Sequence, residues 1–264
     1  MKKLFVIAVL TALAFVACSS GVSDATRTEA GNLIEGISTS ITSALEALPK
    51  AETAQEAAEV AEIFNVTLAA FTAKDTELRQ NEDYFLISKE KSFLTAIDKL
   101  ASDITDLKKS FSGESEAYPL APFATAAART MLADFEAFSV YPMEWLNASA
   151  EAKSLIEALT VLMDEAYVTL RDAKDSSVAA ASLVTYANGV RELAALGTEL
   201  EGKYPNFRKA PSNPNLERPI AEMRSAMVTL GREINEKKKE YCDDKDFNLG
   251  LENMKKIIGA AAER

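Results

Sequence analysis

Apolar side chains recur three and four residues apart along most of this 264-residue chain, and this spacing is the strongest constraint on its fold. Such spacing places the apolar residues on one side of an α-helix, whereas a half-buried strand would show strict alternation, which no segment shows convincingly. We therefore predict an all-α protein with about eight amphipathic helices. The clearest stripes are Ile34, Ile37, Ile41, Leu45 and Leu48; Ala57, Ala61, Phe64, Leu68 and Phe71; Phe93, Ile97, Leu100, Ile104, Leu107 and Phe111; Leu155, Leu159, Leu162, Ala166 and Leu170; Leu183, Ala187, Val190 and Leu193; and Ile220, Met223, Met227, Leu230 and Ile234.

Residues with capping chemistry mark several expected helix ends. Thr53 is followed three residues later by Glu56, which is the pattern of a capping box. The segment 175–177, Asp-Ser-Ser, predicts an N-cap in the second half of the chain. When the two halves are aligned, Ser177 takes the position of Thr53. Pro219 fits the first turn of a helix, where the missing N–H has no cost.

Two segments in the first half of the chain match two segments in the second half. Leu33–Ser38 is similar to Leu155–Thr160, and Leu100–Phe111 is similar to Leu230–Tyr241. The offset between matching positions grows from 122 to 130 residues, as a duplication followed by a loop insertion would produce. A period of this length is far above the ~34–47 residues of common helical repeat arrays, so it favours a duplicated bundle.

The matches predict two duplicated four-helix units at residues 24–138 and 147–264, with a connector at 139–146. The alternative is that unrelated amphipathic helices have converged on similar stripes. The connector holds Tyr141, Met143 and the single tryptophan, Trp145. These side chains predict either a partner-binding patch, because aromatic residues and methionine are enriched at interface cores, or packing between the two units.

The first 17 residues have the flanks and the length of an export signal. Lys2 and Lys3 precede an uncharged, mostly apolar run from Leu4 to Val16. This run is too short to cross a hydrocarbon core, which needs ~20 apolar residues. We therefore assign residues 1–17 to a targeting segment rather than to a transmembrane helix.

The pair Ala17-Cys18 that follows resembles the lipobox of bacterial lipoproteins, with Phe15 in place of the usual leucine. The resemblance implies cleavage by signal peptidase II before Cys18 and acylation of that cysteine, with palmitate-type chains. Two alternatives stay open: an ordinary secretory signal with Cys18 as a plain thiol, and an uncleaved anchor. The mature region resembles the many uncharacterised all-helical lipoproteins of bacterial envelopes, a likeness that implies no activity.

Charge predicts how such an anchored protein would meet a membrane. Removal of the signal takes away two lysines and no acid, so the formal net charge changes from −11 to −13. Anionic lipid and nucleic acid would repel this surface, so we expect no nucleic-acid partner and a membrane contact through lipidated Cys18 alone. Residues 18–23 form a tether of roughly 25 Å. Because Ser19 is not aspartate, sorting rules favour the periplasmic face of the outer membrane over the inner membrane.

The composition excludes many kinds of reactive site, and we expect no cofactor and no metal. The chain has no histidine, which excludes Ser-His-Asp and Cys-His nucleophilic sites and histidine-ligated metals. Asp244 begins a segment like a calcium loop, but Leu249 stands where the glycine belongs, so we expect a surface turn in which Asp246 or Asn248 caps the last helix. Cys242 is followed by two aspartates. Because neighbouring negative charges disfavour the thiolate form, we expect this thiol to be inert.

Three classes of function remain. The first is a non-enzymatic envelope lipoprotein that binds another envelope protein or organises the membrane. The second is a helical bundle that binds a small ligand or solute in the periplasm. The third is an enzyme that uses carboxylates alone, such as Asp103 and Asp106, but these lie opposite the apolar stripe and should be solvated. We therefore expect a protein without catalytic activity.

Overall fold

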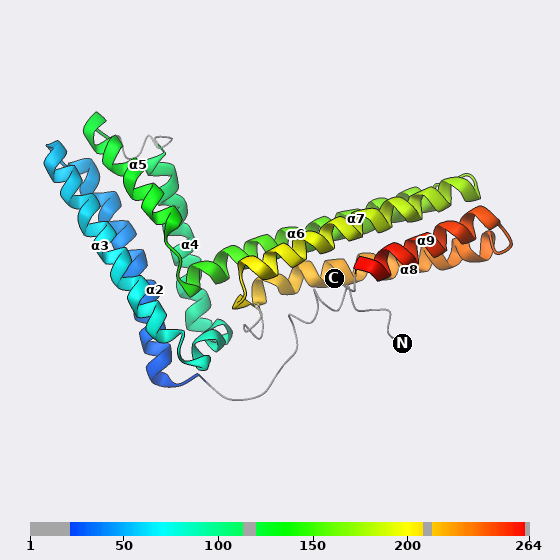
Figure 1. Ribbon diagram of the computed structural model, residues 1–264, viewed down its shortest axis with the longest axis horizontal. Coiled ribbons are helices and arrows are strands. Elements are labelled where there is room, and N and C mark those ends of the chain that lie inside the picture. Colours follow the sequence, from blue (N-terminus) through cyan, green and yellow to red (C-terminus); the bar gives the residue numbers. More distant parts are fainter. Residues whose placement is uncertain (1–21, 113–119, 208–212, 262–264) are drawn as a thin grey trace. The chain divides into compact units, whose positions relative to one another are not determined.

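The computed structural model describes residues 22–112, 120–207 and 213–261 (Figure 1). These residues form eight α-helices and two 3₁₀-helices and contain no strand, so the predicted all-α fold is confirmed. Within the described ranges no helix combines the length and the apolarity that crossing a membrane requires.

The chain divides into two compact units between Leu146 and Asn147. We call residues 22–146 the N-terminal unit and the described residues from 147 onward the C-terminal unit. The division falls inside helix α6, which begins at Tyr141, so most of the expected connector 139–146 is the first part of a helix.

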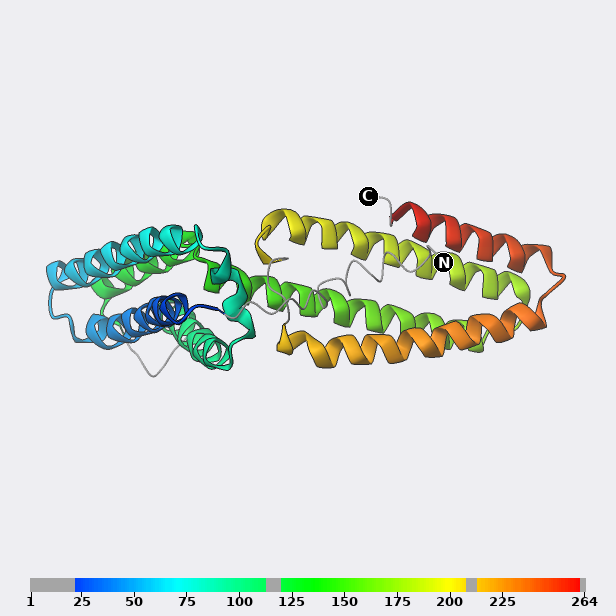
Figure 2. The same cartoon turned by 90° about the horizontal axis from the view of Figure 1, so that it is seen from below.

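Four α-helices and two 3₁₀-helices build the N-terminal unit. Helix α2 packs against both α3 and α4, and α5 packs against the same two helices, so the four form a closed ring around one core. In Figure 2, α3 and α5 (cyan and green) lie on one side of this ring and α2 and α4 (blue and teal) on the other. The elements are α2 (Asp24–Ala47), η2 (Leu48–Lys50), α3 (Ala54–Leu78), η3 (Glu82–Lys89), α4 (Lys91–Phe111) and α5 (Pro122–Ala137).

The predicted stripes supply the core of this ring. Ile37, Ile41, Ile97 and Leu100 are fully buried, as one-sided apolar spacing requires. Phe71 is only half-buried, and its ring packs against Gly36 of α2.

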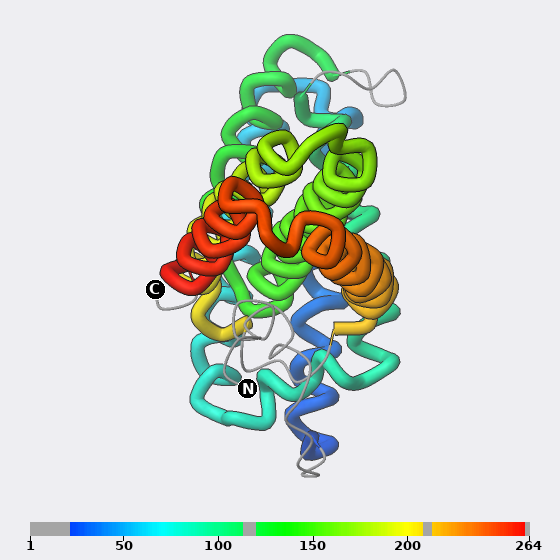
Figure 3. Tube along the Cα trace, turned by 90° about the vertical axis from the view of Figure 1, so that its right-hand side faces the viewer, coloured from blue at the N-terminus to red at the C-terminus, as the bar shows by residue number. Residues whose placement is uncertain are grey.

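The C-terminal unit contains most of α6 (Tyr141–Arg171) together with α7 (Ser176–Lys203), α8 (Pro214–Glu240) and α9 (Lys245–Ala261). Helices α7 and α9, yellow-green and red in Figure 2, pack extensively against each other. A Cβ atom added to Gly250 of α9 would lie 2.6 Å from the Cβ atom of Ala180 and 2.7 Å from its Cα atom. The two backbones therefore nearly touch. The tight turn that joins α8 to α9 is seen in orange-red in Figure 3.

Two of the expected helix starts can be checked in atomic detail. The Thr53 hydroxyl accepts a hydrogen bond from the backbone N–H of Glu56, at 3.2 Å, so this cap is confirmed. The Glu56 carboxylate accepts in turn from the backbone N–H of Glu52. The expected N-cap in segment 175–177 is confirmed at Asp175, whose carboxylate accepts a hydrogen bond from the backbone N–H of Val178. Ser177, which we aligned with Thr53, is not the capping residue, so that part of the prediction is wrong. Asp175 caps because its extended backbone directly precedes the first helical residue.

Pro219 lies inside α8 rather than in its first turn, so that prediction is also wrong. The helix begins at Pro214. Its N-cap is Asn213, whose side-chain oxygen accepts a hydrogen bond from the backbone N–H of Asn215. Pro219 is buried. A proline in the interior of a helix removes one helical hydrogen bond. Burial of the Pro219 ring offsets part of that cost.

The predicted duplication stays a prediction. Each unit contributes four long helical segments, in matching chain order. Glu35 and Glu157, which match in the sequence comparison, are both exposed, as expected for outward positions.

Candidate functional site

The expected lipidation residue, Cys18, lies outside the described residues, as does most of the tether. The tether ends at Ser23, whose hydroxyl accepts from the backbone N–H of Thr26 and caps α2. The helical part of the N-terminal unit therefore begins immediately after the expected tether.

The partner-patch interpretation of Tyr141, Met143 and Trp145 is wrong. Tyr141 and Trp145 are completely buried and Met143 is 8% exposed, so no partner can reach them. The Trp145 ring meets Phe93 edge-on at 5.4 Å between ring centroids, inside the N-terminal unit. Packing explains their burial.

Tyr141 belongs to a buried polar network around Asp75, a carboxylate that is 3% exposed. One Asp75 oxygen accepts from the Tyr84 hydroxyl at 2.7 Å and from the backbone N–H of Tyr141 at 3.0 Å. The other accepts from Nε of Arg79. Because Tyr141 is the first residue of α6, Asp75 fixes the start of that helix in the N-terminal unit, where a carboxylate is favoured by the helix dipole.

Arg79 extends the network to Glu144 through two hydrogen bonds, at 2.7 and 3.1 Å. Burial opposes the charge of Arg79, but the bonds to Glu144 and Asp75 raise its pKa above the usual value. Burial raises the pKa of both Tyr84 and Tyr141 well above the usual range, and at Tyr84 the Asp75 carboxylate adds to the effect. The polar groups of this network therefore hydrogen-bond to one another, which indicates a structural role.

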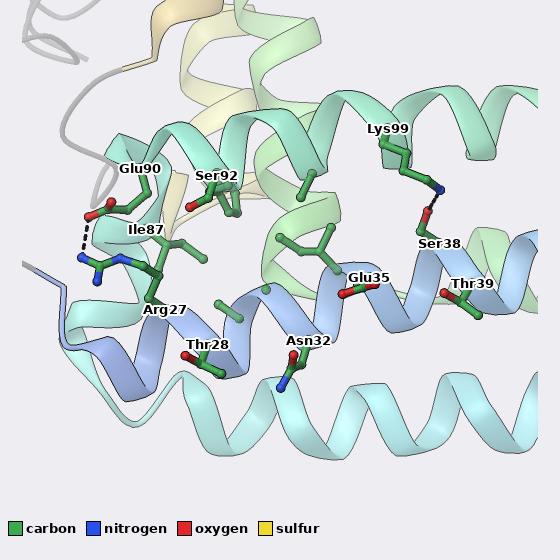
Figure 4. A pocket seen from close by; sticks show the side chains of 15 residues that line it. Arg27, Thr28, Asn32, Glu35, Ser38, Thr39, Ile87, Glu90, Ser92 and Lys99 are labelled. Carbon is green, nitrogen blue, oxygen red and sulfur yellow. Dashed lines mark hydrogen bonds and ion pairs between the residues drawn. The ribbon is translucent and has the colours of Figure 1, made fainter.

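An open groove lies between α2 and α4 in the N-terminal unit (Figure 4). We call it the α2–α4 groove; its volume is about 520 Å³. Small and apolar side chains form its floor, and polar side chains line its rim. The floor residues are Ala30, Gly31, Ile34, Ile87, Phe93 and Ala96, and the rim residues are Arg27, Thr28, Asn32, Glu35, Ser38, Thr39, Glu90, Ser92 and Lys99.

The groove exists because small residues leave room between the two helices. A Cβ atom added to Gly31 would have no neighbour within 4 Å. Two polar cross-links then bracket the space, one at each end (Figure 4). At one end Arg27 donates to Glu90 at 3.2 Å, and at the other end Lys99 donates to the Ser38 hydroxyl.

The cross-link at Ser38 is a structural contact rather than an activated nucleophile. The Ser38 hydroxyl donates to Asp103, and the Lys99 ammonium forms an ion pair with the same carboxylate at 2.7 Å. The Ser38 hydroxyl and the Lys99 side chain are both engaged with the Asp103 carboxylate, as in a polar cross-link between helices. Asp103 is thus half-buried, not fully solvated as expected, and Asp106 is exposed.

Among the groove residues that the structure describes, the Nε atom of Arg27 is buried without an acceptor. The Glu35 carboxylate, between the two cross-links, forms no ion pair or hydrogen bond with the described residues, but it is exposed to water. The hydrogen bond to Glu90 nevertheless holds the charge of Arg27 and raises its pKa. The groove can therefore bind a molecule that has an apolar part and offers hydrogen-bonding or charged groups of its own.

The other candidate residues from the sequence lie elsewhere and do different work. Asp244 caps α9, accepting from the backbone N–H groups of Asp246 and Phe247, so the expected cap at Asp246 or Asn248 is wrong. These backbone hydrogen bonds lower the pKa of Asp244. Cys242 is exposed. No group of three metal-ligating side chains occurs among the described residues.

Sequence analysis missed the residues of the groove. Arg27 and Glu90 are 63 positions apart and carry no shared pattern. The one available signal was Gly31, a glycine within an expected amphipathic helix, where only a packing or binding role offsets its low helix propensity.

The comparisons with known proteins leave the groove as the main clue to function. No protein-family model matches the chain, and no curated protein or solved structure shows significant similarity to it.

Proposed function

We propose that this protein is a lipid-anchored envelope protein without catalytic activity, which binds a small amphipathic ligand in the α2–α4 groove. The observation that carries the proposal is the groove itself. Its volume of about 520 Å³ lies in the range of small-molecule sites, ~300–1,000 Å³, and it combines an apolar floor with few polar groups. The buried Nε atom of Arg27 is a donor that an acceptor group on a ligand would satisfy.

Binding is favoured over catalysis because the reactive types of side chain near the groove are already engaged. Ser38 is 3% exposed and is held by Asp103 and Lys99. A nucleophile must reach its substrate and needs a free base, and neither condition is met at Ser38.

The anchor follows from Cys18 and from charge. A diacylated cysteine holds a protein on a membrane without protein contacts, since each buried methylene contributes ~0.8 kcal/mol. The formal net charge of −13 that remains after removal of Lys2 and Lys3 with the signal opposes any additional contact with anionic lipid. We place the protein at the cell envelope, with the periplasmic face of the outer membrane preferred. Membrane fractionation and intact mass test this: Cys18→Ser should release the protein into the soluble fraction, and a variant that still pellets after a salt wash would overturn the anchor.

Ligand capture is tested with the neutral, environment-sensitive dye Nile red. A leucine at position 31 would occupy the groove, because the glycine there faces open space. We expect Gly31→Leu to abolish the fluorescence increase that wild type gives. Gly197→Leu is the matched control, since Gly197 of α7 also faces open space but lies outside the groove. Equal dye binding by both variants would rule out the groove.

A protein partner is the second candidate, and a specific observation favours it. Ile63 and Val66, one helical turn apart on α3, are 69% and 64% exposed, and neighbouring Ala70 is exposed as well. Photocrosslinking from position 66 on native membranes tests this candidate: one reproducible adduct with an envelope protein would support it, and no adduct would remove it.

A further inference from the structure

We infer that the outer face of α3 in one copy of this chain binds the outer face of α8 in a second copy. The inference does not depend on the α2–α4 groove; it names a partner for the exposed apolar side chains of α3. Charge is distributed unevenly along the chain. Residues 22–146 carry 21 acidic and 10 basic side chains, whereas residues 147–264 carry 19 and 17. The excess of acids therefore lies almost entirely in the N-terminal unit.

The outer face of α3 combines exposed apolar side chains with acids. Ile63 and Val66 are 69% and 64% exposed. Glu59 and Glu62 lie one helical turn nearer the start of α3 and are exposed as well, and Ala70 continues the face in the other direction. We call these five residues the α3 face. Burial of its aliphatic side chains against a partner would be favourable, and its acids call for a basic partner.

The outer face of α8 is basic, although the chain as a whole is acidic. Arg224 and Arg232 lie one helical turn before and after Val228, which is 49% exposed, so the three share one side of the helix. Lys238 and Lys239 follow near the end of α8, which is orange in Figure 2. Arg232 and both lysines line one open hollow of about 570 Å³, so these cations lie close together. We call these five residues the α8 face.

Most cations of the α8 face have no carboxylate partner. Lys239 forms an ion pair with Glu236 at 2.7 Å. Within the described ranges, Arg224, Arg232 and Lys238 form no ion pair. Exposed cations that the chain itself leaves unpaired favour a partner with an acidic surface.

The two faces complement each other, and neither complements itself. Ile63 and Val66 form the apolar centre of the α3 face, and Val228 forms that of the α8 face. Two α3 faces in contact would bring Glu59 and Glu62 against like charges, which is costly. An α3 face against an α8 face brings opposite charges together around the apolar centres. It also joins the acidic unit of one copy to the nearly neutral unit of the next.

Each copy carries both faces, so the same contact can recur. Such a contact between different surfaces builds a ring or an open chain, unless two copies make it twice in a symmetric pair. The faces are small, so we expect a weak association in which charge selects the partner.

Sedimentation velocity of the mature chain tests the inference. The chain carries Cys18→Ser, so that no lipid micelle contributes to the measured mass. We expect the mass to rise above that of a monomer as the protein concentration increases. The association should weaken in about 1 M salt, where the Debye length is ~3 Å. A chain that stays monomeric at every concentration in low salt overturns the inference.

Charge reversal then identifies the faces. Glu59→Lys with Glu62→Lys makes the α3 face basic, and Arg224→Glu with Arg232→Glu makes the α8 face acidic. Each double variant alone should associate about tenfold more weakly than wild type, or less, because like charges then meet. A mixture of the two variants should associate again, because each face then finds an opposite one on the other variant. Since all four positions are exposed, we expect both variants to fold.

Glu46→Lys with Asp98→Lys is the matched control. It makes the same change of net charge as the α3 reversal, at exposed positions of α2 and α4, and should leave self-association at least as strong as in wild type. Equal weakening by the control and by the α3 reversal overturns the inference, as does a mixture that stays monomeric.

An anionic lipid surface is the other occupant that the α8 face could bind. Co-sedimentation with phosphatidylglycerol vesicles tests it. If the wild-type chain stays monomeric but binds these vesicles, and Arg224→Glu with Arg232→Glu abolishes that binding, the α8 face contacts lipid and the inference is overturned. None of these outcomes affects the α2–α4 groove, which the Nile red experiment tests separately.

Discussion

In the N-terminal unit, side chains join helices α2 and α4, whereas in the C-terminal unit the backbones of α7 and α9 nearly touch. Arg27–Glu90 and Ser38–Lys99 bridge the first pair and leave open space at Gly31. The second pair closes on Gly250, where even a Cβ atom would strike Ala180. The same kind of residue, an interior helical glycine, thus belongs to a groove in one unit and to a tight contact in the other.

The polar contacts of the two units differ in the same way. The N-terminal unit buries Asp75 and surrounds it with donors from Arg79, which directly follows α3, from η3 and from α6. In the C-terminal unit, several ion pairs join neighbouring residues of one exposed helix, such as Arg218 with Glu222. A hydrogen bond between buried groups is strong because the surrounding dielectric is low, and the loss of one partner costs much folding stability. Loss of an exposed ion pair changes the folding stability little. We therefore expect the N-terminal unit to depend on its polar contacts and the C-terminal unit on its packing.

The largest expected effect is at Asp75. Asp75→Ala leaves Arg79, the Tyr84 hydroxyl and the Tyr141 N–H without their shared acceptor, and breaking such a buried pair costs ~3–5 kcal/mol. Trp145, the single tryptophan, is buried in the N-terminal unit and reports the loss by fluorescence during urea unfolding.

The control is Asp164→Ala, which removes an exposed aspartate of α6 in the C-terminal unit. Its midpoint of unfolding should match wild type. A similar midpoint for Asp75→Ala would mean that the buried network does not stabilise the N-terminal unit.

The two glycines should respond with opposite signs. Gly250→Ala forces α7 and α9 apart and should lower the free energy of unfolding by ~1–3 kcal/mol, the usual cost of overpacking. Gly31→Ala should raise it by ~0.5–1 kcal/mol, because the new methyl group meets open space and the unfolded chain loses freedom. Thermal unfolding followed by circular dichroism measures both. A shift of the same sign for both variants would contradict the contrast between the groove and the tight contact.

Alkaline pH should separate the units through their buried tyrosines. Burial raises the pKa of Tyr84 and Tyr141 in the N-terminal unit and raises the pKa of Tyr186 in the C-terminal unit to about 12. Each folded pKa lies above the unfolded value of about 10, so this stability is complete below pH ~10 and is lost as pH rises further. The loss is at most ~1.4 kcal/mol per pH unit for each tyrosine. For Tyr186 the loss of stability ends near pH 12, whereas for Tyr84 and Tyr141 it continues to higher pH.

Urea unfolding between about pH 9 and pH 12, followed by Trp145 fluorescence and by total helicity, measures these slopes. Tyr84→Phe should be less stable at neutral pH, because Asp75 loses a donor, and should show a shallower alkaline decline in the N-terminal unit. An unchanged slope in this variant would show that Tyr84 does not control the alkaline response.

Local signals predicted most of the fold from the sequence. Apolar spacing predicted the helices, since burial of one helical face is encoded within each segment, and Thr53 predicted its cap because capping partners lie three residues apart. Pro219 misled because the start of α8 depends on Asn213, which caps the helix five residues before the position expected from the proline.

The candidate site could not be predicted, because its contacts depend on tertiary geometry. Arg79 pairs with Glu144 across 65 positions, and Ser38 meets Lys99 across 61. Many other charged residues could have formed such pairs equally well from the sequence alone. Tyr141 and Trp145 show the opposite error: their composition fits an interface, but whether they face a partner or the core is decided only by the neighbours that the fold supplies.

The smallest expected effect is at Glu151, the C-terminal unit's counterpart to Asp75 as an acceptor of two side chains. Lys203 donates to Glu151 at 2.5 Å and Tyr204 donates at 2.8 Å, but the Glu151 and Lys203 side chains are 43% and 58% exposed. Partial burial raises the pKa of Glu151, and the bonds to Lys203 and Tyr204 outweigh this and lower it.

A lowered pKa means that this contribution is present above the unfolded value and disappears as pH falls through the folded value. Glu151→Gln should therefore lower the free energy of unfolding at neutral pH by no more than ~0.5 kcal/mol, because solvent screens an exposed pair. The difference from wild type should vanish in acid and shrink in about 1 M salt, where the Debye length is ~3 Å. A loss as large as that of Asp75→Ala, measured in the same urea titration, would show that exposed polar contacts stabilise this unit as strongly as buried ones stabilise the other.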